Sequence, residues 1–553
     1  MSLVHRPTAR IKIPSPMKIE LTETEAKLCQ ILDECTVHLQ KEKGISTTCR
    51  IAGGWVRDKL LGSQCNDIDI ALSNIMGVAF AEHLAAFAQA KGVQAGTISK
   101  IALNPDQSKH LETATFKIFG LDIDLVNLRS EEYSETSRIP TEVLFGTPLQ
   151  DALRRDITIN AMFYNVHNHL VEDFTSKGLD DLHEGVIRTP LPPKETFRDD
   201  PLRVLRCIRF ASRFGFELVP DIKPAAQDSE IQNALVTKVA RERIGDEISK
   251  MMKGQDPLHS IRLIHELALY PSIFSALPPE VSSTVSAAPS GSEQAVSAAA
   301  ILNTLLLPEQ PSFPKLHRRL LAALHTDPSC RPRLYLAAAL IPYLGVTYRD
   351  KKKNLRLAVE VVTREALKLG KQNHYLDGIP LLFTAAELLG SFVTHHLTSP
   401  PAKERKTIGL ILRDKSVHNT TAGVHWTASL LFSLVIQLSK SYKSTEDFFG
   451  SNTAASIITS YNSFVERIEA LDLTDAADAK PILDGREIVL ALGAKKHGAW
   501  VGETLAKVVE WQLEHPQGTR DECLLWLEHE RSSGNLCFDD DSLGPASKRA
   551  RTK

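Results

Sequence analysis

The sequence predicts an α+β fold in which a mixed-sheet N-terminal domain precedes a long all-α remainder. Two runs rich in β-branched and aromatic residues, "LDIDLVNLR" (121–129) and "ITINAMFYNV" (157–166), are typical of strands. From about Asp199 onward, apolar residues recur at helical spacing, as in "DPLRVLRCIRFASRF" and "RERIGDEISKMM". The 553 residues, 43% of them hydrophobic, are enough for several packed domains.

Composition argues against several classes of protein. The formal net charge is only -2, so nucleic-acid binding would depend on local basic patches. The eight cysteines contain no C-x-x-C pair, which argues against a zinc site or a disulfide framework and indicates a reducing compartment. No apolar run reaches the length of a membrane span, so we expect no membrane association. No obligate protein partner is evident.

The two ends of the chain carry possible targeting signals. The first 18 residues are basic and contain no acid before Glu20, as in a mitochondrial presequence, and Met17 offers a second start. A frayed basic tail would explain the same composition. The C-terminal "ASKRARTK" is either a nuclear import signal or a solvated tail. These features predict a protein of mitochondrion, cytoplasm and nucleus.

The stretch "IAGGWVRDKLLGSQCNDIDIAL" (51–72) joins a glycine turn to a helix and then to a strand. Gly53 and Gly54 have no Cβ atoms, so backbone N–H groups can approach an anion closely. A helix that begins after such a turn suits phosphate, and Arg57 adds a forked donor on its first turn.

Asp67 and Asp69 follow on the expected strand, where they share one face at about 7 Å between Cα atoms. Such a pair can bind two Mg²⁺ ions, which prefer carboxylate and phosphate oxygens. A D-x-D alone is a weak signal, and the glycine turn before it makes it stronger. A third carboxylate is expected from Asp122 or Asp124, of which we prefer Asp124 because it lies deeper in its apolar run.

These residues resemble the signature of the class II tRNA nucleotidyltransferases, the CCA-adding enzymes of the polymerase-β-like superfamily. Further motifs follow in the family's order: "RRDITINA" (154–161), "DFTSKGLDDL" (173–182), "DDPLRVLRCIRF" (199–210) and "ARERIGDE" (240–247). The resemblance is strong over 48–250, and residues 482–516 are similar to the tail of eukaryotic, fungal-like members. Two departures, Asp199 for Glu and Ile157 for Phe, are conservative.

The motifs suggest roles for their residues in nucleotide binding. Arg155 can neutralise phosphate, Asp156 can accept from a ribose hydroxyl, and Asn160 can donate to a phosphate oxygen.

Asp200 and Arg203, i and i+3 on one expected helix, present an acceptor beside a forked donor. Cytosine and adenine match that pair, while guanine and uracil leave its groups unpaired. Arg206 and Arg209 continue this stripe toward the ribose, the triphosphate or the RNA end. In "ARERIGDE", Glu242 and Arg243 are interpreted as structural ion-pair residues.

The resemblance implies a polymerase-β-like head and a helical neck, body and tail. We expect an N-terminal extension with a first helix (1–44), the catalytic head (45–170), the neck with the selecting helix (171–260) and the body (261–400). The tail (401–535) would bind tRNA, with Lys495 and Lys496 as candidate phosphate contacts, and 536–553 would be a disordered basic end.

The sequence thus predicts an enzyme that adds C, C and A to tRNA 3′ ends from CTP and ATP without a template. A poly(A)-adding or CC-adding enzyme shares the same catalytic motifs and stays open as an alternative. An inactive RNA-binding scaffold fits less well, because Asp67 and Asp69 are both present.

Overall fold

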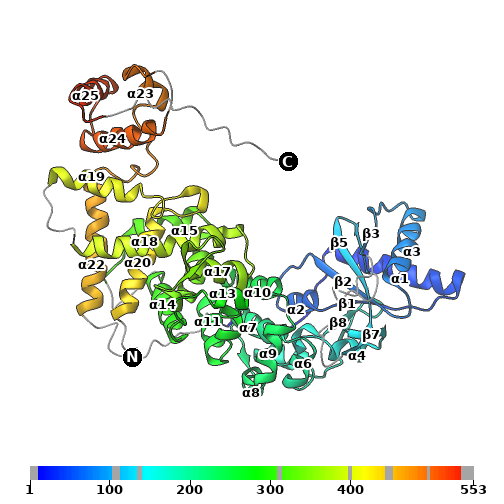
Figure 1. Ribbon diagram of the computed structural model, residues 1–553. Coiled ribbons are helices and arrows are strands. Elements are labelled where there is room, and N and C mark those ends of the chain that lie inside the picture. Colours follow the sequence, from blue (N-terminus) through cyan, green and yellow to red (C-terminus); the bar gives the residue numbers. More distant parts are fainter. Residues whose placement is uncertain are drawn as a thin grey trace, which may run out of the picture. The chain divides into compact units, whose positions relative to one another are not determined.

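The computed structural model describes residues 10–101, 113–133, 140–307, 314–395, 401–441, 452–494 and 498–536. The chain divides into two compact units (Figure 1). Unit 1 comprises Met1–Asn303 and Arg331–Leu376, and unit 2 comprises Thr304–Cys330 and Asp377–Lys553.

Unit 1 begins with a seven-stranded sheet in the order β3-β4-β5-β2-β1-β8-β9 (Figure 1). The sheet is mixed, because β2 and β5 run parallel while the other pairs are antiparallel. The strands are β1 (Cys49–Ala52), β2 (Asp67–Leu72), β3 (Ser99–Ile101), β4 (Thr113–Ile118), β5 (Leu121–Asn127), β8 (Phe163–Asn165) and β9 (Val171–Glu172). The predicted α+β class, with its mixed-sheet head, is confirmed.

Helices α1 (Glu23–Lys43), α2 (Gly54–Leu60), α3 (Gly77–Ala90) and α4 (Pro148–Leu153) accompany the sheet. A capping box starts α1, in which Thr22 and Glu25 satisfy each other's backbone N–H groups. Glu25 also accepts from Lys59 and from the Trp55 indole, so a buried ion pair joins α1 to α2. This contact fixes the helix that follows the glycine turn.

The second strand expected from the sequence, 157–166, is only partly a strand. Residues Thr158–Asn160 form a 3-10 turn, and β8 covers only Phe163–Asn165. The turn closes through hydrogen bonds from Asn160 N to Ile157 O and from Ala161 N to Thr158 O. The β-branched composition therefore misled the prediction, because contacts of Thr158 with Asp181 and of Asn160 with Arg57 override local propensity.

The rest of unit 1 is almost wholly helical. Helix α7 (Leu202–Phe214) contacts α10 (Arg241–Lys253) and α11 (Pro257–Glu266), and a buried hydrogen bond of 2.7 Å joins Ser212 to Ser260. The other helices of seven or more residues are α5 (Gly178–Glu184), α6 (Pro193–Asp199), α9 (Ser229–Thr237), α14 (Glu293–Leu305) and α16 (Cys330–Ala339).

The described part of unit 2 is helical. Its main helices are α18 (Tyr375–His395), α19 (Pro401–Leu412), α20 (Trp426–Ser441), α22 (Asn452–Ala470), α23 (Gly485–Ala491), α24 (Trp500–Glu514) and α25 (Arg520–Ser532). Helix α20 is buried along most of its length, and α23–α25 enclose a core around Val508 and Trp511.

One segment, Gln372–Val393, is long and apolar enough by length and composition to cross a bilayer. The expectation that no apolar run reaches this length was therefore wrong for this segment. Half of it is buried inside the protein, as in the core helix of a soluble protein, so it is weak evidence for a membrane span.

Candidate functional site

The largest group of predicted site residues lines one cavity in unit 1. The cavity has a volume of about 390 Å³ and lies between α2 and β2 of the sheet domain and helices α7 and α10. Seven arginines and three aspartates line it, so it suits a strongly anionic ligand. Ten predicted nucleotide-binding residues are among the lining residues: Gly53, Gly54, Arg57, Arg155, Asp156, Asn160, Asp200, Arg203, Arg206 and Arg209.

The glycine turn forms as expected, with one difference. Gly53 has φ 75° and ψ -126°, a conformation that other residues rarely adopt, and a Cβ there would lie 2.8 Å from an Arg155 guanidinium nitrogen. Its own N–H donates to Met162 O at 3.0 Å. This N–H is therefore engaged within the protein, and the first turn of α2, which begins at Gly54, faces the cavity instead.

A chain of polar contacts crosses the cavity from α2 to α7. Arg57 donates to the Asn160 side-chain oxygen, Asn160 donates to Asp156 at 3.1 Å, and Arg206 donates to Asp156 at 2.7 Å. Burial favours a raised pKa for Asp156, but the charge and hydrogen bond of Arg206 outweigh it, so its pKa lies below the usual value. Asp156 therefore stays ionised and holds both neighbours in place.

A second buried carboxylate orients Arg155. Asp151 is 1% exposed and accepts from Arg154 and Arg155, the latter at 2.9 Å. Burial opposes ionisation, but these two arginines outweigh it and lower the Asp151 pKa to about 2. Arg155 also donates to Asn160 O at 3.2 Å, which places its guanidinium group against the glycine turn.

Three carboxylates come together where β2 and β5 pair in parallel. The register sets Asp69 opposite Asp124, and the carboxylate oxygens of Asp67, Asp69 and Asp124 lie within 4.8 Å of one another. Burial, followed by the charge of Asp67, raises the pKa of Asp69 to about 6. Asp122 lies apart from this group, is largely exposed and pairs with Lys117 at 3.4 Å.

The structure changes the expected arrangement of Asp200 and Arg203. Helix α7 begins at Leu202, so Asp200 precedes the helix and its carboxylate accepts from Leu202 N at 3.1 Å. Arg203 donates to Thr196 O and Arg154 O instead of to Asp200. The two side chains line the same cavity, but they do not share one helical face as expected.

Several cavity residues escaped the sequence interpretation. Arg243, expected only to brace the neck, donates to Asp200 at 2.7 Å. Phe210 and Arg213 also line the cavity, and the guanidinium carbon of Arg209 lies 4.1 Å from the Phe210 ring centroid. The spacing of Arg206, Phe210 and Arg213 along α7 could have revealed them, because i, i+4 and i+7 lie on one helical face.

Two predicted site residues cannot be placed. Lys495 and Lys496, the candidate tRNA contacts, lie outside the described residues.

Two family models match the chain. The poly A polymerase head domain matches residues 49–188, which include the carboxylates and the glycine turn. The probable RNA and SrmB-binding site of polymerase A matches residues 215–283.

Similar proteins extend over nearly the whole chain. A mitochondrial CCA tRNA nucleotidyltransferase of Candida glabrata is 39% identical and covers 92% of this chain and 96% of its own length. The corresponding protein of Saccharomyces cerevisiae is 38% identical, with 92% and 94% covered.

Solved structures support the same fold. A CCA-adding enzyme in complex with ATP superposes with a TM-score of 0.57 at 20% identity, covering 94% of this chain and 96% of that one. The Thermotoga maritima CCA-adding enzyme complexed with tRNA has a TM-score of 0.54 at 19% identity, with 92% and 96% covered.

Proposed function

Because the chain belongs to the CCA tRNA nucleotidyltransferase family, we propose that it adds C, C and A to tRNA 3′ ends from CTP and ATP. The observation that carries the proposal is the arginine-rich cavity, which brings together the ten residues expected to bind the nucleotide and also contains Asp69. The product is one diphosphate and one extended RNA strand per nucleotide added.

The three carboxylates fit a magnesium site. Mg²⁺ prefers oxygen ligands, and the group consists of carboxylate oxygens only, at the edge of a cavity that suits a triphosphate. Asp67, Asp69 and Asp124 would hold the metal. Burial and, after it, the charge of Asp67 raise the Asp69 pKa, and a bound cation would offset both by stabilising the ionised carboxylate. When bound, two such ions supply polarisation of the attacking hydroxyl and charge neutralisation at the phosphates.

The arginines act on the triphosphate. Arg57 and Arg155 lie against the glycine turn, where Gly53 leaves room that any side chain would fill. Arg206 and Arg209 reach the same cavity from α7, where they and Arg57 lie over the Phe210 ring. Their fixed guanidinium groups stabilise the charge that develops on the leaving diphosphate, without reorganising during the reaction.

Asp200 and Arg203 choose the base. Cytosine and adenine each present an amino donor next to a ring-nitrogen acceptor, which complements one carboxylate and one guanidinium group. A uracil or guanine presents its donor and acceptor in the reverse order, so it cannot pair with both protein groups at once. Asp156 accepts hydrogen bonds from Arg206 and Asn160 and holds those two side chains in position. It is therefore less suited to contact a ribose than the sequence suggested.

The remaining features concern the RNA and the compartment. The helical tail, with Lys495 and Lys496, is proposed to bind the tRNA backbone. The basic N-terminus and the mitochondrial names of both fungal relatives support a mitochondrial enzyme. Cytoplasmic and nuclear pools would depend on Met17 and on the basic C-terminus. The division into head, neck, body and tail remains a prediction.

The test is incorporation into tRNA that lacks its 3′ end, with the four labelled nucleotides supplied singly and in pairs. We expect two additions from CTP alone, three from CTP with ATP, and none after chelation of divalent metal. Asp69→Asn should abolish incorporation and keep tRNA binding, while the exposed control Asp221→Asn should match the wild type. A long tail from ATP alone would make this a poly(A)-adding enzyme and overturn the proposal.

A further inference from the structure

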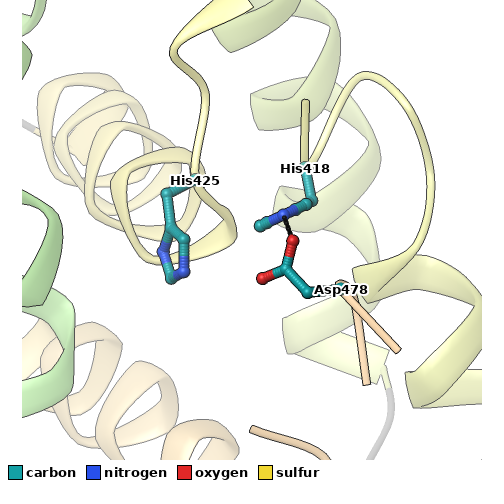
Figure 2. A group of neighbouring side chains, drawn as sticks. All are labelled: His418, His425 and Asp478. Carbon is teal, nitrogen blue, oxygen red and sulfur yellow. Dashed lines mark hydrogen bonds and ion pairs between the residues drawn. The ribbon is translucent and has the colours of Figure 1, made fainter. Parts of the chain in front are cut away.

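A second group of metal-ligating side chains lies in unit 2, outside the cavity. His418, His425 and Asp478 each place one possible ligand atom within 4.8 Å of the other two. Figure 2 shows the three side chains gathered between a loop and a turn. The proposed nucleotidyl transfer uses none of them, and the cysteine pattern of the sequence does not indicate such a group.

The first two members are brought together by a closed loop. Asn419 and Val424 form an antiparallel bridge, with reciprocal backbone hydrogen bonds of 2.7 and 2.9 Å. His418 and His425 are the residues immediately outside this bridge, so their rings lie side by side with centroids 5.1 Å apart. Gly423 closes the loop in the left-handed conformation, at φ 67°.

The third member comes from a turn that the protein holds firmly. Asp478 lies between α22 and α23, and Arg413 donates to Ala476 O at 2.5 Å and to Ala479 O at 2.7 Å. These bonds fix the backbone on both sides of Asp478. Its carboxylate lies 2.9 Å from His418 Nε2.

The ring orientations suit metal binding. His425 Nδ1 lies 2.8 Å from the Thr427 hydroxyl, which can accept its proton and leave Nε2 as a ligand, the usual outer-shell arrangement of metal-bound histidine. Two backbone N–H groups approach the Nδ1 atoms of His418 and His425 at 3.4 and 3.3 Å. In these contacts the N–H groups of Trp426 and Thr427 donate to Nδ1. Both bonds are long and weak, so little hydrogen bonding is lost when the proton moves to Nδ1 and Nε2 binds the metal.

We propose that His418, His425 and Asp478 bind one Zn²⁺ ion that joins the 418–425 loop to the turn after α22. Two imidazoles and a carboxylate form a mixed nitrogen and oxygen set, which Zn²⁺ accepts and Mg²⁺ does not favour. Tetrahedral ligands at about 2.0–2.2 Å from zinc lie about 3.4 Å apart. The observed 2.9 Å between His418 Nε2 and the Asp478 carboxylate is shorter than that value, so the two groups would move apart by about 0.5 Å to admit the ion. Asp478 is 62% exposed, so water can complete the shell.

The test uses the full-length protein, stripped by a chelator and titrated with Zn²⁺ against a chromophoric competitor. We expect one tight site per chain. His425→Gln and Asp478→Asn should each weaken it by about 100-fold, since even outer-shell partners contribute about 10- to 100-fold. Asp478→Asn keeps an acceptor for His418 and lies at the surface, so it should not disturb folding. The exposed His529→Gln is the matched control.

Two further measurements locate the ion. Asp69→Asn should leave tight Zn²⁺ binding unchanged, because the carboxylate group of unit 1 is separate. Co²⁺ substituted into the wild-type protein should give the intense visible bands of a tetrahedral site, independently of any variant. Equal Zn²⁺ affinity in wild type, His425→Gln and Asp478→Asn would overturn the proposal. Loss of the tight site in Asp69→Asn, or a weak octahedral Co²⁺ spectrum, would do the same.

Discussion

Arg243 donates to the Asp200 carboxylate at 2.7 Å, and this bond joins α10 to the segment just before α7. Arg203, the other member of the proposed base-selecting pair, is held separately by the carbonyl oxygens of Thr196 and Arg154. The acceptor and the donor proposed to contact the base thus have independent supports. Their relative position depends on the packing of α7 against α10.

Removing the support of Asp200 should impair base choice. In Arg243→Ala the carboxylate loses a charge-assisted hydrogen bond of about 1.5–3 kcal/mol. We expect kcat/KM for CTP and ATP to fall by about 10- to 100-fold, and the relative use of UTP to rise. Single-nucleotide kinetics on tRNA lacking its 3′ end would measure both. The exposed neighbour Glu242→Gln should behave as wild type, and unchanged selectivity in Arg243→Ala would contradict a positioning role for Arg243.

The two carboxylates of β5 should differ sharply in importance. Asp124→Asn removes a member of the Asp67 and Asp69 group, so we expect activity to fall by about 100-fold or more. Asp122→Asn removes an exposed carboxylate paired with Lys117, and activity should stay within about twofold of wild type, since exposed ion pairs contribute little. Incorporation rates at saturating magnesium would compare them. Similar losses in both variants would argue against Asp124 as the third carboxylate.

The glycine turn should tolerate no side chain. Gly53→Ala places a Cβ 2.8 Å from Arg155 and also strains a left-handed backbone, so we expect both stability and nucleotide binding to fall. Gly92→Ala is a matched control, because its φ is 72° and nothing lies within 4 Å of the added Cβ. The control should show only the backbone cost, about 1–2 kcal/mol. Binding of a non-hydrolysable CTP analogue, measured by calorimetry, should separate the two, and equal affinities would refute the steric explanation.

The buried ion pair between α1 and α2 should be important for stability. Lys59→Met leaves the Glu25 carboxylate uncompensated at 3% exposure, so we expect a loss of about 3–5 kcal/mol. Lys27→Met breaks an exposed pair with Glu23 on the same helix and should leave the melting temperature close to that of the wild type. Thermal unfolding of both variants would test this. A small shift for Lys59→Met would mean that Glu25 finds another partner or water.

The sequence predicted the fold well where local pattern and chemistry agree. The alternation of Asp67 and Asp69 with apolar residues correctly predicted β2. The adjacent glycines Gly53 and Gly54 correctly predicted the turn before α2. The strand expected at 157–166 forms only in part, because Thr158 bonds to Asp181 and Asn160 to Arg57, partners that the local sequence does not reveal.

The sequence identified residues that line one cavity, but it did not reveal how they pair. Ten of the expected nucleotide-binding residues line one cavity, although which groups bond to each other depends on contacts between distant segments. Spacing suggested an Asp200–Arg203 pair, while the partner of Asp200 lies on another helix. Likewise both carboxylates of β5 lie opposite an aspartate of β2, and the structure separates them by side-chain position: Asp124 joins the Asp67 and Asp69 group, while Asp122 is exposed and pairs with Lys117.

The arginines of the cavity carry their own counter-ions. Arg206 forms an ion pair with Asp156, Arg209 with Glu247, and Arg155 with Asp151. An incoming triphosphate would therefore meet guanidinium groups that are already partly neutralised and held in position. The carboxylates would keep those groups in position after diphosphate leaves. The empty site would then need no rearrangement before the next nucleotide binds.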